Sequence, residues 1–80
     1  MYKMDKRDLY VVFSGKRGKY FQGTTYGRFF AWTRSLEDAF WFLTREKANN
    51  IIQEPGMEEC EIKECVAFYP NGQAAYIQLK

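Results

Sequence analysis

The stretch LYVVFSGKRGKYFQ, residues 9–22, decides the fold because it predicts a complete β-hairpin. Residues 9–14 are rich in β-branched and aromatic side chains, which favour a strand. Residues 15–18 read Gly-Lys-Arg-Gly and predict a turn, since a glycine at each end accepts a positive φ angle. Residues 19–22 return as the second strand, so the tip of the hairpin carries three cations.

Two further stretches show strand patterns. Residues 28–32 follow a polar loop at 23–27, and they form a third extended segment or continue the second strand across a bulge. Residues 61–69 alternate between two faces. One face carries Ile62, Glu64, Val66 and Phe68, and the other carries Lys63, Cys65, Ala67 and Tyr69.

The C-terminal residues predict a last hairpin. Pro70-Asn71-Gly72 is a tight-turn signal, because Asn and Gly tolerate left-handed backbone angles. Residues 73–79 then return as the final strand, with Ala75, Ile77 and Leu79 on one side. This strand is lightly charged and could be an exposed edge that pairs with a second copy, so both a monomer and a homodimer are open.

The middle of the chain allows two interpretations. Ser35-Leu36-Glu37-Asp38 fits a capping box, which would start a single helix running to about residue 53. However, the four bulky residues 40–43 would cover every side of a helix. We prefer a helical turn at 36–39, a buried strand at 40–43, and a helix capped by Thr44. In that helix, one face carries Ala48, Ile51 and Ile52, and Pro55-Gly56 ends it.

These elements predict a single α+β domain over residues 1–80, a small antiparallel β-sheet of hairpins packed against one main α-helix. No apolar run approaches the length of a membrane span. The N-terminal MYKMDKRDLY has no apolar core, so we expect no secretory signal. The expected location is the cytoplasm, with no membrane association.

Cys60 and Cys65 are expected to be ordinary reduced thiols. Their odd separation on one strand puts them on opposite faces, where they cannot form a disulfide. The chain contains no histidine, so a metal site lacks ligands, and we expect neither a metal nor another cofactor.

Charge is divided between the two parts of the chain. Residues 1–34 carry eight Lys or Arg against two Asp, whereas residues 35–80 carry four Lys or Arg against eight acidic residues. Nine of the fifteen aromatic residues also fall in the basic part. Cations interleaved with flat rings suit a polyanion, because phosphates contact the cations and bases stack on the rings.

These residues predict a nucleic-acid-binding surface built around the first hairpin. Three cations lie at its tip, and the earlier ones precede the strand closely enough to join them. Single-stranded or structured RNA is favoured over DNA, because exposed tyrosines suit unpaired bases and no basic recognition helix is evident. The candidate residues are Lys3, Lys6, Arg7, Lys16, Arg17, Lys19, Tyr20, Tyr26, Arg28 and Arg34.

An enzymatic function is not expected. Without histidine the usual general base at neutral pH is missing, together with the nucleophile arrangements that depend on it. Residues 15–19 contain glycines and cations but lack the spacing and the final Ser or Thr of a phosphate-binding P-loop.

The segment from Lys19 to Ala48, with GKYF, then WTRSLEDA, then FLTREKA, resembles a pattern in small uncharacterised bacteriophage proteins. The resemblance covers about thirty residues and implies a phage accessory protein acting in the host cytoplasm. Such proteins commonly disable a host factor, including nucleases, toxin–antitoxin systems and other defences. The alternative is a protein-only inhibitor that docks on a host protein through its aromatic sheet face or its acidic C-terminal half.

Overall fold

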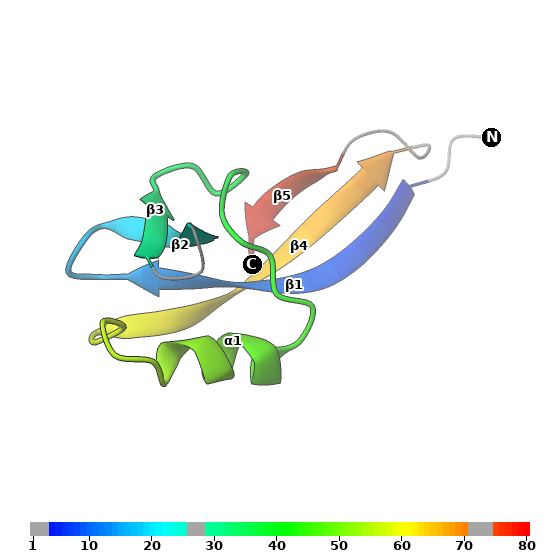
Figure 1. The fold of residues 1–80 in the computed structure, drawn as a ribbon. Coiled ribbons are helices and arrows are strands. Elements are labelled where there is room, and N and C mark those ends of the chain that lie inside the picture. Colours follow the sequence, from blue (N-terminus) through cyan, green and yellow to red (C-terminus); the bar gives the residue numbers. More distant parts are fainter. Residues whose placement is uncertain (1–3, 26–28, 71–74) are drawn as a thin grey trace.

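The computed structural model describes residues 4–25, 29–70 and 75–80, which form a five-stranded antiparallel sheet with one short helix (Figure 1). The strand order is β3-β2-β1-β4-β5. The predicted sheet of hairpins is therefore confirmed, but the helix is only 8 residues long and covers part of one face rather than forming a layer. The elements are β1 (Met4–Ser14), β2 (Lys19–Thr25), β3 (Phe29–Thr33), α1 (Arg45–Ile52), β4 (Cys60–Pro70) and β5 (Tyr76–Leu79).

β1 is the central strand and is longer than the sequence predicted. It pairs with β4 along its full length, from Met4 opposite Pro70 to Ser14 opposite Cys60. The strand was predicted to begin at Leu9, because residues 5–8 are all charged. Pairing with the apolar end of β4 overrides that weak local preference. In Figure 1 the early part of β1 runs with the end of β4 and with β5 as a three-stranded arm, away from α1, β2 and β3.

β2 stays beside β1 for only two residue pairs, Phe13 with Tyr20 and Ser14 with Lys19. β3 is a separate third strand paired with β2, so that alternative is confirmed, and a register shift lies between Phe21 and Gly23. Gly23 has a φ of 120°, a backbone angle that side chains disfavour.

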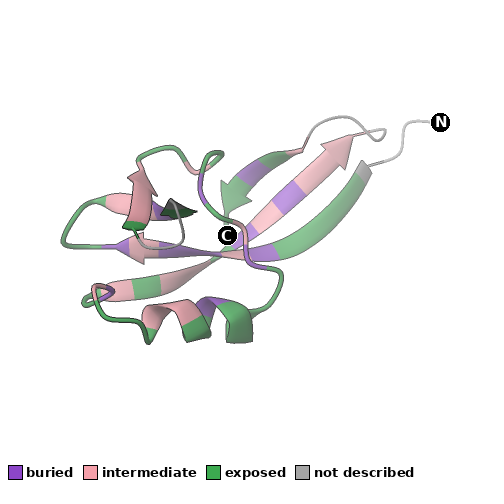
Figure 2. Cartoon of the chain, in the orientation of Figure 1, coloured by how far each residue is buried: buried purple, intermediate pink, exposed green. Residues whose placement is uncertain are grey.

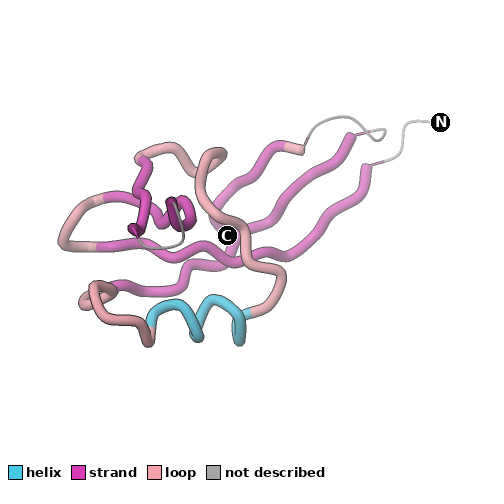
Figure 3. The backbone as a smooth tube through the Cα atoms, in the orientation of Figure 1, coloured by secondary structure: helices cyan, strands magenta, loops and turns pink. Residues whose placement is uncertain are grey.

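The segment that links β3 to α1 is an irregular loop (Figure 3), and its backbone bonds to both β2 and β1. The Phe40 N–H donates to the Phe21 carbonyl at 2.8 Å, and Phe42 exchanges two backbone hydrogen bonds with Tyr10 at 2.8 and 2.9 Å. The predicted buried strand at 40–43 was thus too long. It is a one-residue bridge at Phe42, which is 7% exposed, whereas Phe40 is 46% and Leu43 61% exposed.

The start of the helix matches the preferred interpretation rather than a single helix from residue 36. The Lys47 N–H donates to Thr44 Oγ1 at 3.2 Å, so Thr44 is the N-cap. Residues 36–38 form only a turn, in which the Asp38 N–H donates to the Ser35 carbonyl at 3.2 Å. That backbone bond replaces the predicted capping box.

Apolar side chains pack on both faces of the sheet. On the helix face, Ala48 is fully buried and packs with Ile51 and Ile52 against the strands, as predicted. That cluster comprises Val12, Phe21, Phe42, Ala48 and Met57. On the opposite face, which we call the far face, the linking segment covers a second cluster of Leu9, Val11, Ala39, Cys65, Ala67 and Ile77. Figure 2 shows that β1 is exposed within the arm and buried along its middle.

The two cysteines lie on opposite faces of β4, as predicted, because Cys60 is opposite Ser14 and Cys65 is opposite Leu9. Both thiols are free. Burial raises the pKa of each.

β5 forms one edge of the sheet and pairs only with β4. Ile77 and Leu79 share a face, as predicted, since they lie opposite Ala67 and Cys65. The predicted turn at Asn71 and Gly72 falls outside the described residues. Within the described part of the chain, no helix is long and apolar enough to cross a membrane.

Candidate nucleic-acid interface

Four of the predicted cations gather at one end of the sheet. Lys16 and Arg17 lie in the turn between β1 and β2, and Lys19 begins β2. Arg34 follows Thr33, which pairs with Tyr20, so it lies beside the start of β2. We call this region the hairpin end. It comprises the 15–18 turn, the start of β2, the end of β3 and the start of β4.

Lys6 and Arg7 do not join this group. They lie inside β1, opposite Phe68 and Ala67 in the arm, and not before the strand and near the tip as predicted from the sequence. At about 3.3 Å per residue, Lys6 is roughly 26 Å along the strand from Ser14. Arg7 and Lys6 also line a surface hollow with Asp5 and Tyr69, so a carboxylate accompanies them.

Three further candidates, Lys3, Tyr26 and Arg28, lie outside the described residues. The interface is therefore defined by the cations of the hairpin end and by Tyr20.

An aromatic pair lies on the far face at the hairpin end. The Phe13 and Tyr20 rings are 5.1 Å apart and meet edge to face at 61°. The ammonium of Lys63 is 5.1 Å from the centre of the Phe13 ring. Both rings are half-buried, and α1 lies on the other side of the sheet. Each residue therefore keeps part of its surface accessible.

Phe13 and Lys63 were not among the site residues predicted from the sequence. The sequence feature that could have identified Phe13 is the four-residue turn at 15–18. A turn of that length pairs Ser14 with Lys19 and so sets Phe13 beside Tyr20.

Arg17 is held in place on the helix face. Its guanidinium lies 4.3 Å from the centre of the Trp32 ring, in cation–π geometry. Its backbone N–H donates to Ser14 Oγ at 3.1 Å, and Nη1 approaches the same oxygen at 3.5 Å. Arg17 therefore helps to fix the turn as well as adding charge to it.

Carboxylates also approach the hairpin end. The Gly15 N–H donates to the Glu59 carbonyl at 3.4 Å, which places the 57–59 turn beside the tip. The pKa of Glu58 is lowered by the backbone N–H groups of Glu58 and Gly56, and less strongly by Lys16 and Arg17. The hairpin end and the adjoining turn together carry five cations and three carboxylates: Lys16, Arg17, Lys19, Arg34 and Lys63, with Glu58, Glu59 and Glu61. The region keeps a net positive charge.

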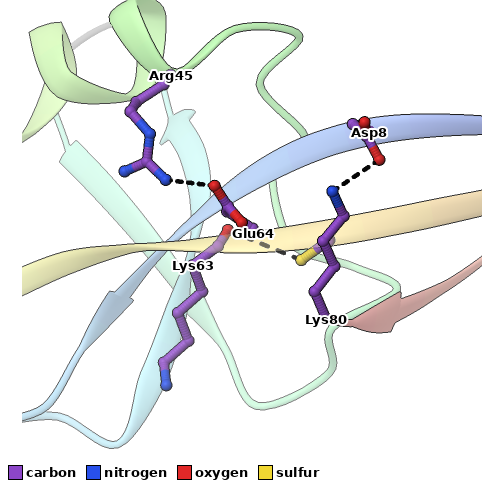
Figure 4. Close-up of polar contacts among 6 residues, drawn as sticks. Asp8, Arg45, Lys63, Glu64 and Lys80 are labelled. Atoms are coloured by element: carbon purple, nitrogen blue, oxygen red, sulfur yellow. Dashed lines mark hydrogen bonds and ion pairs between the residues drawn. The ribbon is translucent and has the colours of Figure 1, made fainter.

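Two cations of the C-terminal half, Arg45 and Lys80, pair with carboxylates outside the hairpin end. Arg45 Nη2 lies 2.7 Å from Glu64 Oε1, and Lys80 Nζ lies 2.9 Å from Asp8 Oδ1 (Figure 4). The hydrogen bond to Asp8 raises the pKa of Lys80. In Figure 4 the Lys63 side chain points away from Arg45. It lies 3.4 Å from Glu61, an ion pair beside the aromatic pair.

Within residues 4–25, 29–70 and 75–80, no group of three or more Cys, Asp or Glu residues could hold a metal ion. Comparisons with protein-family models, with curated proteins and with solved structures find no match. Function is therefore inferred from the chemistry of the hairpin end.

Proposed function

We propose that this protein is a non-enzymatic binder of single-stranded nucleic acid, RNA favoured, and that the hairpin end is its binding surface. The observation that carries the proposal is the Phe13–Tyr20 pair on the far face, with Lys63 against one ring. Lys16, Lys19 and Arg34 lie at the same end of the sheet and add positive charge around the pair, with Lys19 on the face of its partner Ser14. Rings with adjacent cations are the combination that single strands require.

The ligand class follows from the geometry. Aromatic rings on a sheet can stack only on bases that are not already paired. A duplex reader would need a basic element for a groove, but α1 lies on the other face and its Arg45 pairs with Glu64. RNA is favoured because its loops and ends offer unpaired bases. The wider role, an accessory factor that antagonises a host defence or nuclease system, rests on the sequence resemblance alone.

The test is a fluorescence-anisotropy titration with labelled oligouridine and oligothymidine at several salt concentrations. Lys16→Glu/Lys19→Glu should lower the steepness of the log–log salt dependence by about 1.4, at about 0.7 per lost phosphate contact. Tyr20→Leu keeps apolar bulk but removes the ring, and should weaken binding roughly 5- to 150-fold, the equivalent of about 1–3 kcal/mol of base stacking. Glu61→Gln should tighten binding, because it frees Lys63.

Lys6→Glu is the matched control, since it reverses an exposed lysine at the other end of β1. It should leave affinity nearly unchanged. Absence of binding by the wild type at low salt would refute the proposal. A loss in Lys6→Glu as large as in the tip variants would refute the placement of the surface. A lysate partner that survives nuclease treatment would favour the protein-only inhibitor instead, whose exposed anchors would include Phe40 and Leu43.

A further inference from the structure

In the part of the chain that the structure describes, β5 is an edge strand that lacks the usual protection against pairing. Natural edge strands are blunted by charged side chains, proline, bulges or a covering element. The strand reads Tyr-Ile-Gln-Leu, with no charge, proline or glycine. Tyr76 is 41% and Leu79 43% exposed. Such an edge is a template for another strand.

The register shows which backbone groups face outward. The Lys80 N–H donates to the Glu64 carbonyl at 3.0 Å, so the backbone N–H and carbonyl of residue 80 point toward β4. Because inward and outward residues alternate in an antiparallel ladder, Gln78 and Tyr76 also point inward. Ile77 and Leu79 therefore present their N–H and carbonyl groups at the edge. Among the described residues, no backbone hydrogen bond outside the strand ladders involves the N–H or carbonyl group of Ile77 or Leu79.

We propose that β5 pairs antiparallel with β5 of a second copy of this chain, about a two-fold axis at Gln78. In this register, Ile77 lies opposite Leu79 of the second copy, and Leu79 lies opposite Ile77 of the second copy. The outward backbone groups of both residues are therefore hydrogen-bonded. Gln78 then faces Gln78, and Tyr76 faces Lys80 of the second copy. The apolar side chains meet on the far face, and the two Lys80 ammonium groups, each bound to its own Asp8, stay apart.

The edge is self-complementary, which favours a second copy over an unrelated strand. A four-residue strand buries a small area, so the dimer should be weak and concentration-dependent. It would carry two hairpin ends on one continuous sheet, and a long single strand could then contact both. The pairing itself does not depend on the proposed nucleic-acid function and is measured without any ligand.

The experiment is disulfide trapping supported by sedimentation velocity. Directly opposite residues that do not exchange hydrogen bonds have Cα atoms about 4.5 Å apart, within disulfide reach. Gln78→Cys should therefore oxidise to a covalent dimer. Tyr76→Cys, also an exposed site on β5, should not, because residue 76 faces residue 80 of the second copy. The wild type, which contains only the cysteines Cys60 and Cys65, shows how much covalent dimer forms through the native thiols. Little is expected, since Cys65 is fully buried and Cys60 is half-buried.

Sedimentation of the wild type should show a monomer–dimer equilibrium that shifts with concentration. Leu79→Pro should abolish it while keeping the circular dichroism spectrum, because the proline removes an outward N–H and spares the ladder to β4. A wild type that is monomeric at every concentration, together with equal trapping of Gln78→Cys and Tyr76→Cys, would overturn the proposal. A monomer whose β5 captures a strand of another protein would overturn it as well.

Discussion

Replacing Phe42 with alanine tests whether the linking segment holds the two parts of the sheet together. Phe42 is 7% exposed, and its ring centre lies 4.7 Å from that of Phe40 and 6.2 Å from that of Phe21. Because the site is enclosed, truncation removes nearly all of the ring's burial and leaves a cavity. The expected loss in the free energy of unfolding is about 3–5 kcal/mol. A domain of this size has only roughly 4–12 kcal/mol in total.

Phe40→Ala is the matched control, two residues away in the same segment. Phe40 is 46% exposed, so about half of the transfer free energy is lost and the site opens to solvent instead of forming a cavity. The expected loss is about 1 kcal/mol. Urea unfolding followed by tryptophan fluorescence and by far-ultraviolet circular dichroism measures both variants. Equal losses, or a loss below about 1 kcal/mol for Phe42→Ala, would refute the role assigned to Phe42.

Two further predictions follow from the perturbed pKa values. In the native protein at neutral pH, a disulfide reagent such as DTNB should label Cys60 before Cys65, and both more slowly than in urea, because burial raises the pKa of both thiols and Cys65 is fully buried. Rapid labelling of Cys65 under native conditions would contradict this. At pH 7, Glu58→Gln should have a lower urea midpoint than the wild type. The fold lowers the pKa of Glu58, so its carboxylate stabilises the native protein at pH values above its ordinary pKa of 4.5. That stabilisation is lost as pH falls through the lowered pKa, so the urea midpoints of the two proteins should converge in acid; a constant difference would show that the carboxylate charge is irrelevant.

Local patterns predicted most elements of this fold. The hairpin at 9–22, the alternation of 61–69 and the Thr44-capped helix with Ala48 on its buried face all depend on neighbours in sequence. The early part of β1 was missed because its residues are charged, and only long-range pairing with β4 makes them a strand. Likewise, Phe42 lies in an extended position because Tyr10 has outward backbone groups that β2 leaves unpaired.

The candidate site was predicted in part for the same reason. The cations near the 15–18 turn stay together because a short turn connects them. The position of Lys6 and Arg7 depends instead on the pairing of β1 with a strand more than fifty residues later in the chain, which composition cannot reveal. The Phe13–Tyr20 pair is an intermediate case, since the turn length determines it but hydrophobicity alone suggests a core residue.

The unequal ladders of β1 have a consequence for how the chain folds. The nearby partner, β2, contributes two pairs, whereas the distant partner, β4, contributes eleven. The first hairpin alone is therefore a poor nucleus, and the chain must close a large loop before its main ladder can form. Folding should be slow for so small a domain, in the millisecond-to-second range of non-local β proteins, and a stopped-flow refolding rate well above that range would show that the ladder is not limiting.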